Sequence, residues 1–381
     1  MVPPELPDAI IIHYYLCQKR KQRNMSDRVK ITVWNDFRHE ENNDKANNAP
    51  DWVSIGSHGC WGLPDIRQDP GNPTSYIVTW QQYRDGTHEQ VMDVKYSVYN
   101  VKTKSFSDEA YVFNHEHLAR LQAHPCWGYW GGEYRIFYCE CQRHNPNGKA
   151  VEVKAARWSD FQKYSVSDNE KAVTPELGFH PHLQFVPVNE SNAWLFYTIG
   201  NRENKICYSI FDSHCGWDKS GHPIPTSKLV GDEAFTMGSA FLEGNDIVIY
   251  SSTYELQMNR RTEKHGVAYR FRSNGGGNAW TAEKVIVSGI HEPFARSGEL
   301  FIRVIKTKGK YFLSSQSNES HRYLAEGNDG IQFNVIHDFG EKPSLGNAMV
   351  SIEGTNGILL VYAAKSGDQL GGKIECMLVS V

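Results

Sequence analysis

The chain has 381 residues and a formal net charge of −4, and aromatic residues make up 12% of it. This mild acidity offers no basic surface for nucleic acid or for an anionic membrane, so we predict neither partner. No apolar run reaches the roughly 18 residues that a membrane-spanning helix needs.

The N-terminal residues do not resemble a secretory signal. Ala9–Cys17 is apolar but short, and the charges around it run in the opposite order to those of a signal peptide. We therefore expect residues 1–24 to be a disordered or non-native extension, with Met25 as a candidate start. Eight cysteines without a C-x-x-C pair favour a reduced chain, which leaves the compartment open and favours the cytoplasm.

A unit of short strands recurs six times along the chain. In each unit, two runs rich in Val, Ile, Tyr and Phe are bounded by Gly, Asn and Asp. The pairs are Ser75–Gln82 with Met92–Tyr99, Glu133–Cys141 with Ala150–Arg157, Ala193–Ile199 with Lys205–Phe211, Ile247–Ser252 with Val267–Arg272, Lys310–Ser315 with His321–Ala325, and Ile358–Ala363 with Lys373–Val379. Their offset of roughly 45–60 residues is typical of propeller blades. The pattern predicts an all-β, six-bladed β-propeller that occupies residues 25–381 as one domain.

The fourth unit is the most complete. It reads as four strands, namely Phe235–Phe241, Asp246–Thr253, Gly266–Arg272 and Lys284–Val287. The turn from Ser273 to Trp280 resembles the "Asp box" S-x-D-x-G-x-x-W of sialidase-type propellers, with Gly275 at the Asp position. Looser forms follow other third strands, at Asp212 and at Asn328-Asp329-Gly330, where Asn328 takes the Asp position. Each turn is expected to join the third and fourth strands of its blade.

The last unit lacks an outer strand, because the sequence given ends at Val381. Arg28–Trp34 is a good strand without a unit of its own. Its pairing with the last unit would close the ring and remove the free sheet edges.

Scattered matches extend the resemblance over most of the chain from about residue 50. Glu292-Pro293, Arg303 and the Asn328-Asp329-Gly330 turn are similar to the "EP…R…S-x-DGG" order of the sialidase superfamily, also called BNR-repeat proteins. The segment from His58 to Trp80 resembles the first blade of bacterial and fungal BNR proteins, some of which are polysaccharide lyases acting on uronic-acid sugars. The resemblance implies a sialidase-like propeller that is closer to the lyase-like members than to true sialidases.

Two departures argue against a sialidase mechanism. True sialidases grip a carboxylate with three arginines, one of them in an R-I-P motif, whereas this chain has Leu63-Pro64 there and Arg67 displaced. The tyrosine nucleophile of that family should fall near Asn347-Ala348-Met349, where the sequence has none.

Candidate site residues gather where each blade begins, because the first strand of a blade lines the central channel. His58-Gly59-Cys60-Trp61-Gly62 recurs as His124-Pro125-Cys126-Trp127-Gly128, and later blades begin with His180-Pro181-His182 and with His291-Glu292. Neutral histidines bind transition metals, so one divalent metal held by His180, His182 and His291 is one prediction. His58 and His124 are candidate general bases. The repeated motif could equally be structural, with Trp61 and Trp127 either packing in the core or stacking on sugars.

These residues support three functions on an oligo- or polysaccharide. The leading one is a lyase, in which Arg296 or Arg303 holds a uronate carboxylate and a histidine takes the neighbouring proton. Arg67 is a further candidate for substrate binding. The first alternative is a glycoside hydrolase that uses Asp65 and Glu292 as its carboxylate pair. The second is a sugar-binding propeller without catalysis, because fold alone does not define function.

Overall fold

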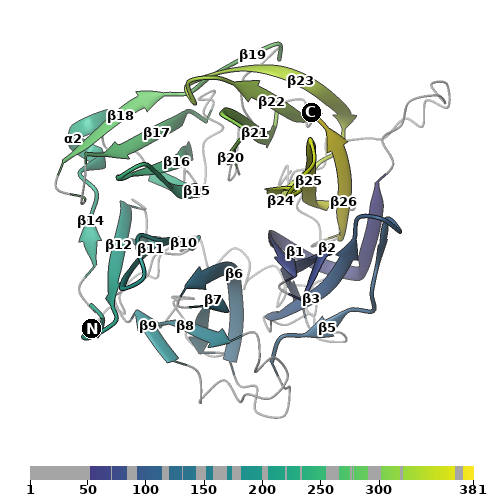
Figure 1. Ribbon diagram of the computed structural model, residues 1–381, viewed down its shortest axis with the longest axis horizontal. Helices are drawn as coiled ribbons and strands as arrows, with labels where there is room; N and C mark the ends of the chain where they lie inside the picture. The colour runs from purple at the N-terminus through teal and green to yellow at the C-terminus, as the bar shows by residue number, and fades with distance from the viewer. Residues whose placement is uncertain are drawn as a thin grey trace, which may run out of the picture.

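A computed structural model of the chain consists almost entirely of β-strands arranged as a ring (Figure 1). It describes residues 52–69, 71–83, 92–113, 120–130, 132–142, 152–157, 170–173, 182–199, 205–218, 221–231, 234–254, 266–274, 277, 279–290, 302–317, 321–364 and 372–381. Some side chains inside strands, those of residues 56–63 among them, lie outside this description. The predicted extension 1–24 lies outside it as well.

Six blades surround the centre of the ring, and the first and sixth belong to one sheet because they share β1. In the fifth blade the first strand, β19, lies at the outer edge beside β23. The first blade contains β1 (Val53–Asp69), β2 (Asn72–Tyr83), β3 (Met92–Asn100), β4 (Ser105–Phe106) and β5 (Ala110–Tyr111). The second contains β6 (Arg120–Trp130), β7 (Glu133–Gln142), β8 (Glu152–Arg157) and β9 (Glu170–Val173). The third contains β10 (Gln184–Pro187), β11 (Asn192–Ile199), β12 (Lys205–Asp212), β13 (Gly216–Trp217) and β14 (His222–Pro223). After the short helix α2 (Thr226–Val230), the fourth blade contains β15 (Ala234–Glu243), β16 (Asp246–Tyr254), β17 (Ala268–Ser273) and β18 (Trp280–Lys284). The fifth contains β19 (Ile286–Ser288), β20 (Arg303–Thr307), β21 (Lys310–Gln316), β22 (His321–Gly327) and β23 (Gln332–Glu341). The sixth contains β24 (Ser344–Ser351), β25 (Gly357–Ala364) and β26 (Gly372–Ser380). The predicted six-bladed, all-β propeller is confirmed.

An N-terminal strand closes the ring. Val53–Ile55, the first part of β1, pairs with Cys376–Ile374 of β26, and the later part of β1 pairs with β2, for example Asp65 with Thr79. One strand therefore serves as the outer strand of the sixth blade and the inner strand of the first. Arg28–Trp34, to which the sequence assigned this role, lies outside the described residues.

The hydrophobic core lies between neighbouring blades. Within the described chain, each of six buried clusters joins two successive blades, and one of them packs Ile77 and Val94 of the first blade against Trp127 and Ile136 of the second. Both faces of a middle strand are therefore buried, which explains why its sequence reads as a continuous apolar run. In β11, for instance, the six residues between its two ends are all buried.

The outer edge of the fourth blade differs from the prediction. Its fourth strand is Trp280–Lys284, which pairs with β17, whereas Ile286–Ser288 pairs in parallel with β23 of the fifth blade. The predicted strand Lys284–Val287 therefore spans the end of one sheet and the start of another. Buried Val285 separates the two, and its N–H still donates to the carbonyl of Ala268.

Aspartates fix two of the turns between third and fourth strands. Asp212 Oδ1 accepts the N–H groups of His214 at 2.8 Å and Cys215 at 3.2 Å. Asp329 Oδ1 likewise accepts two N–H groups that follow it, at 2.8 Å each. Asp329, and not the predicted Asn328, thus makes the turn-forming contacts, because its carboxylate lies beside the free backbone donors. These bonds lower the pKa of both aspartates.

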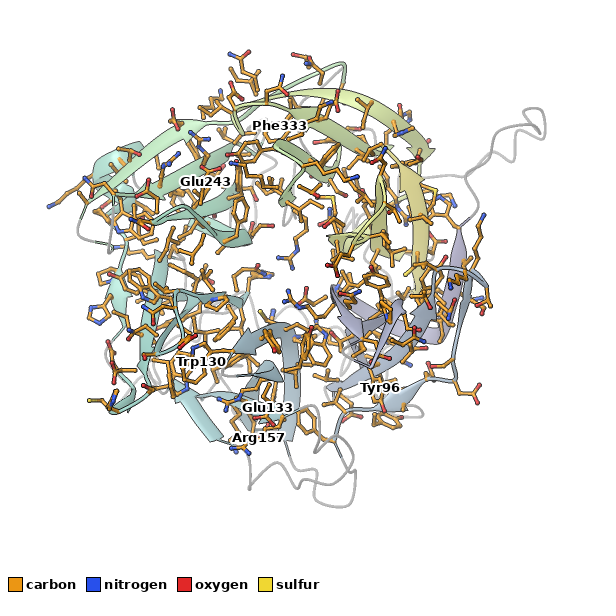
Figure 2. The ribbon with its side chains drawn as sticks, viewed as in Figure 1. Tyr96, Trp130, Glu133, Arg157, Glu243 and Phe333 are labelled. Carbon is orange, nitrogen blue, oxygen red and sulfur yellow. The ribbon has the colours of Figure 1, made fainter. Side chains whose placement is uncertain are left out.

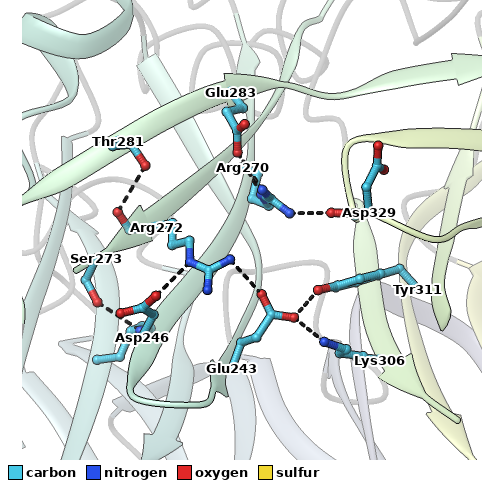
Figure 3. A network of polar contacts seen from close by, with 12 residues as sticks. Glu243, Asp246, Arg270, Arg272, Ser273, Thr281, Glu283, Lys306, Tyr311 and Asp329 are labelled. Atoms are coloured by element: carbon cyan, nitrogen blue, oxygen red, sulfur yellow. Dashed lines mark hydrogen bonds and ion pairs between the residues drawn. The ribbon is translucent and has the colours of Figure 1, made fainter. Parts of the chain in front are cut away.

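A polar network joins the fourth and fifth blades (Figure 3). Glu243 accepts hydrogen bonds from Arg272 at 3.0 Å and from Lys306 at 2.5 Å, and it also accepts from the Tyr311 hydroxyl. Burial alone would raise the pKa of Glu243, but the Lys306 and Tyr311 bonds and two cations together hold it below its usual value. The charged form of Glu243 therefore stabilises this contact between blades.

None of the helices in the described part of the chain is long and apolar enough to span a membrane. Cysteines with free thiols there include Cys126, Cys207, Cys215 and Cys376.

Candidate functional site at the propeller axis

Irregularities in the innermost strands shape the centre of the ring. In β6, the register shifts between Ala123 and Cys126, so that His124 and Pro125 face one residue of β7. Similar shifts occur in β1, β15 and β24. A β-bulge turns side chains and carbonyl groups away from the regular ladder, and it is common beside functional sites. Four inner strands therefore present groups that a regular sheet would direct between the blades.

Arg303, the first residue of β20, is held by two of these bulges. Its Nε donates to the carbonyl of Asn347 in β24 at 2.9 Å, and its Nη1 donates to the carbonyl of Gly238 in β15. A Cβ at Gly238 would lie 2.5 Å from the Ile302 carbonyl oxygen, so only glycine allows this close approach. Burial lowers the pKa of Arg303. In the described chain these are its two hydrogen bonds, although a guanidinium has five N–H donors.

Asp65, in the middle of β1, is the carboxylate next to this cation. Its Oδ2 accepts the backbone N–H of Trp127 at 2.6 Å. Burial raises the pKa of Asp65, and the charge of Arg303 and two backbone N–H groups only partly oppose this effect. Both side chains are surrounded by protein, yet each keeps part of its surface exposed. A raised pKa in a deep, accessible carboxyl group suits a proton donor.

Two histidines complete the described part of the site. The rings of His124 and His182, from the second and third blades, lie edge to face with their centres 5.1 Å apart, and both are buried. His124 has a positive φ of 56°, which is rare outside glycine, and its N–H donates to Gln81 Oε1 at 2.9 Å. The described residues contain no group of three His, Cys, Asp or Glu side chains that could hold a metal. The predicted partners His180 and His291 lie outside them, so the metal stays a prediction.

The other predicted residues do not all belong to this cluster. Trp127 is 6% exposed and packs in the core between the first two blades, so its burial favours the packing alternative over a sugar platform. Arg296 and Glu292 lie outside the described residues, as do the side chains of His58 and Trp61. Side chains point from the innermost strands toward the centre of the ring, whereas Arg157 lies at its rim (Figure 2).

Arg67 lies farther along β1 than Asp65, toward the turns that follow the innermost strands of the fifth and sixth blades. It follows Asp65 by two residues and so shares its face of β1, but its guanidinium stacks over the ring of Tyr134 at 5.6 Å. Arg67 lines a pocket of about 390 Å³ together with turns of the fifth and sixth blades. β1 carries Arg67 past the bulged part of the strand, and its role in substrate binding stays a prediction.

Two groups that accept hydrogen bonds from Arg303 were not identified from the sequence, namely the carbonyl groups of Gly238 and Asn347. Every residue has a carbonyl group, so the sequence gives no signal for its role. Gly238 inside the run Phe235–Phe241 could have indicated a β-bulge or a place where another part of the backbone comes close.

Comparison with solved structures places this geometry in a known architecture. The "Hadza microbial sialidase Hz136" superposes with a TM-score of 0.57 at 10% identity, covering 84% of this chain and 66% of that chain. This chain thus spans just under two thirds of that sialidase. A variant of the NanB sialidase from Streptococcus pneumoniae gives a TM-score of 0.56 at 11% identity, with 87% and 71% covered. The chain has the fold of the sialidase-like β-propellers.

A sialidase-like propeller of matching length is the alpha-L-arabinanase of Penicillium chrysogenum in complex with arabinobiose. Its TM-score is 0.55 at 10% identity, and the match covers 86% of this chain and 98% of that chain. No protein-family model matches the sequence, and a search of curated protein sequences finds no match. At these identities the likeness establishes the fold of this sialidase-like propeller and leaves its chemistry to the site.

Proposed function

We propose that this sialidase-like propeller is a carbohydrate-active enzyme that cleaves an acidic glycan by β-elimination at its axis. The observations that carry the proposal are a carboxyl group with a raised pKa beside a cation on the first and fifth blades, and a buried histidine pair from the second and third blades. Solved structures of this fold include proteins named sialidase and arabinanase, which supports a saccharide ligand.

Each group has a defined part in the elimination. Arg303 binds the uronate carboxylate with its remaining N–H groups, which makes the adjacent C5 proton removable. His124 takes that proton as general base, and the electron pair forms the C4–C5 double bond as the C4–O bond breaks. Asp65 gives its proton to the departing oxygen. One proton is taken and one is returned, so the step needs neither water nor an oxidant.

Hydrolysis is the second candidate, and the names of the similar structures favour it. The phage phi92 endosialidase and the two sialidases above share this fold with the arabinanase. Asp65 would again protonate the leaving oxygen, while Glu292 would activate water or attack the sugar. Retaining and inverting enzymes differ in the separation of these two carboxylates.

The test is a panel of uronate-containing polysaccharides with two readouts. Elimination creates an unsaturated uronate that absorbs ultraviolet light, whereas hydrolysis creates reducing ends without that absorbance. We expect both signals to rise together for this propeller, and His124→Gln to reduce turnover by about 10²-fold or more. Reducing ends without the absorbance would replace elimination by hydrolysis. Binding without either product would leave a sugar-binding propeller.

A further inference from the structure

A second site lies at the end of the channel where the innermost strands turn into the second strands. The pocket of about 390 Å³ is lined by the end of β1, by Tyr134 at the start of β7, and by the turns after β20 and β24. Its volume falls in the lower part of the roughly 300–1,000 Å³ range of small-molecule sites. None of the residues that line this pocket takes part in the proposed elimination.

The charges of this pocket favour an anion. Arg67 and Lys308 line it, against one carboxylate, that of Glu353. Among the described residues, no carboxylate forms an ion pair with the Arg67 guanidinium, which rests on the Tyr134 ring and interacts only electrostatically with Asp65. Lys308 donates to Asn356, a neutral amide. A guanidinium that is oriented by a ring and keeps its N–H groups available is suited to grip a carboxylate or sulfate in bidentate fashion.

The uncharged lining favours a sugar. Tyr134 pairs across the β6–β7 hairpin with Tyr129, whose ring centre is 4.5 Å away and which is 41% exposed. Tyr134 lines the pocket, whereas Tyr129 packs against it from outside the lining and so helps to orient its ring. Thr307 and Ser351 also line the pocket, and within the described part of the chain their hydroxyl groups form no hydrogen bond, so both are candidates to bind sugar hydroxyls.

We propose that this pocket binds a sugar unit that carries one negative charge, either a uronate or a sulfated sugar. Arg67 binds the anionic group, Tyr134 contacts the ring with Tyr129 packed behind it, and Glu353, Thr307 and Ser351 bind sugar hydroxyls. This site holds a glycan without cleaving it, because Asp65 and the histidine pair lie along the channel beyond Arg67.

The experiment measures dissociation constants by titration calorimetry or ligand-observed NMR, with D-glucuronate, glucose 6-sulfate, D-glucose and inorganic sulfate as probes. We expect at least one of the two charged sugars to bind about tenfold more tightly than glucose and than inorganic sulfate. Arg67→Gln should weaken that binding about tenfold. Tyr129→Ala, at an exposed position where folding is not at risk, should weaken it about fivefold. Arg157→Gln, on the same blade with a side chain that is 57% exposed, should change nothing.

Further outcomes separate this site from the axial one. Asp65→Asn should not weaken the binding of the charged sugar even where it abolishes turnover, because it removes a negative charge that interacts with Arg67. If Asp65→Asn removed binding while Arg67→Gln and Tyr129→Ala had no effect, the sugar would occupy the axis and the second site would not exist. Inorganic sulfate binding as tightly as the charged sugars would reduce the pocket to an anion site and overturn the saccharide assignment. Equal binding of glucose would overturn the role of Arg67.

Discussion

Replacement of Arg322 by methionine should weaken the contact between the fifth and sixth blades, next to the strand that closes the ring. Arg322 is fully buried in β22, and its Nη1 donates to Glu375 of the sixth blade at 2.5 Å. Its Nε lies 2.7 Å from Ser344 Oγ and 3.0 Å from the carbonyl of Lys342. The guanidinium also contacts two aromatic rings, 4.6 Å from the centre of Tyr362 and 5.0 Å from that of Trp52, which directly precedes the closing strand.

The expected loss follows from these contacts. Removal of one partner of a buried ion pair costs roughly 3–5 kcal/mol, because the other charge stays buried without compensation. Since the side chain of Glu375 is 19% exposed, we take the lower end, about 3 kcal/mol. The two ring contacts contribute about 1 kcal/mol more. Arg322→Met should therefore lower the free energy of unfolding by about 4 kcal/mol.

Urea unfolding followed by tryptophan fluorescence measures this loss. The matched control is Arg157→Met, which breaks an exposed contact with Glu133 at 3.5 Å and should cost less than about 1 kcal/mol. The double variant Arg322→Met/Glu375→Met should recover at least half of the loss, because no buried charge is then left alone. A loss in Arg322→Met no larger than the control, or a double variant no more stable than the single one, would refute the reasoning.

Three further outcomes follow from titratable and tightly packed positions. Because the folded pKa of Asp65 is raised, its charged form destabilises the fold, so Asp65→Asn should be more stable than wild type at pH 7, with the gap closing as pH falls through that pKa. Glu243 has a lowered pKa, so Glu243→Gln should lose stability at pH 7 and match wild type once the pH falls below the lowered pKa. Gly277→Ala would place a Cβ 2.3 Å from the Trp194 ring and should cost about 2–4 kcal/mol, against about 1 for Gly309→Ala, which has the same positive φ and open space. Denaturant titrations across pH check all three. If the free energy of unfolding of Asp65→Asn or Glu243→Gln depended on pH as that of wild type does, the pKa assignment for that residue would be contradicted.

The middle strands of the blades were predictable because each is buried on both faces. Runs such as Ala193–Ile199 and Ile358–Ala363 are apolar along nearly their whole length, and the structure places both where the sequence indicated. Their recurrence gave the number of blades. The outer strand Trp280–Lys284 is short and mostly exposed or half-buried, so the change of sheet at Val285 had no comparable signal.

The axis was harder to predict because bulges and backbone carbonyl groups define it. Asp65 and Arg303 were both candidates, but no pattern indicated that carbonyl groups of two other blades hold the arginine. The buried Arg322 escaped notice for a related reason, since an arginine in a strand normally reads as exposed. In both cases residues that are far apart in the sequence provide the partners.

The central claim is that Asp65 donates a proton to a glycan bound at the axis. Its most direct test is the turnover of Asp65→Asn on the acidic polysaccharide that wild type cleaves, with binding of that polysaccharide measured on the same samples. We predict that kcat falls by about 10²-fold or more while the dissociation constant changes little. An unchanged kcat in a variant that binds the glycan as wild type does would contradict the account.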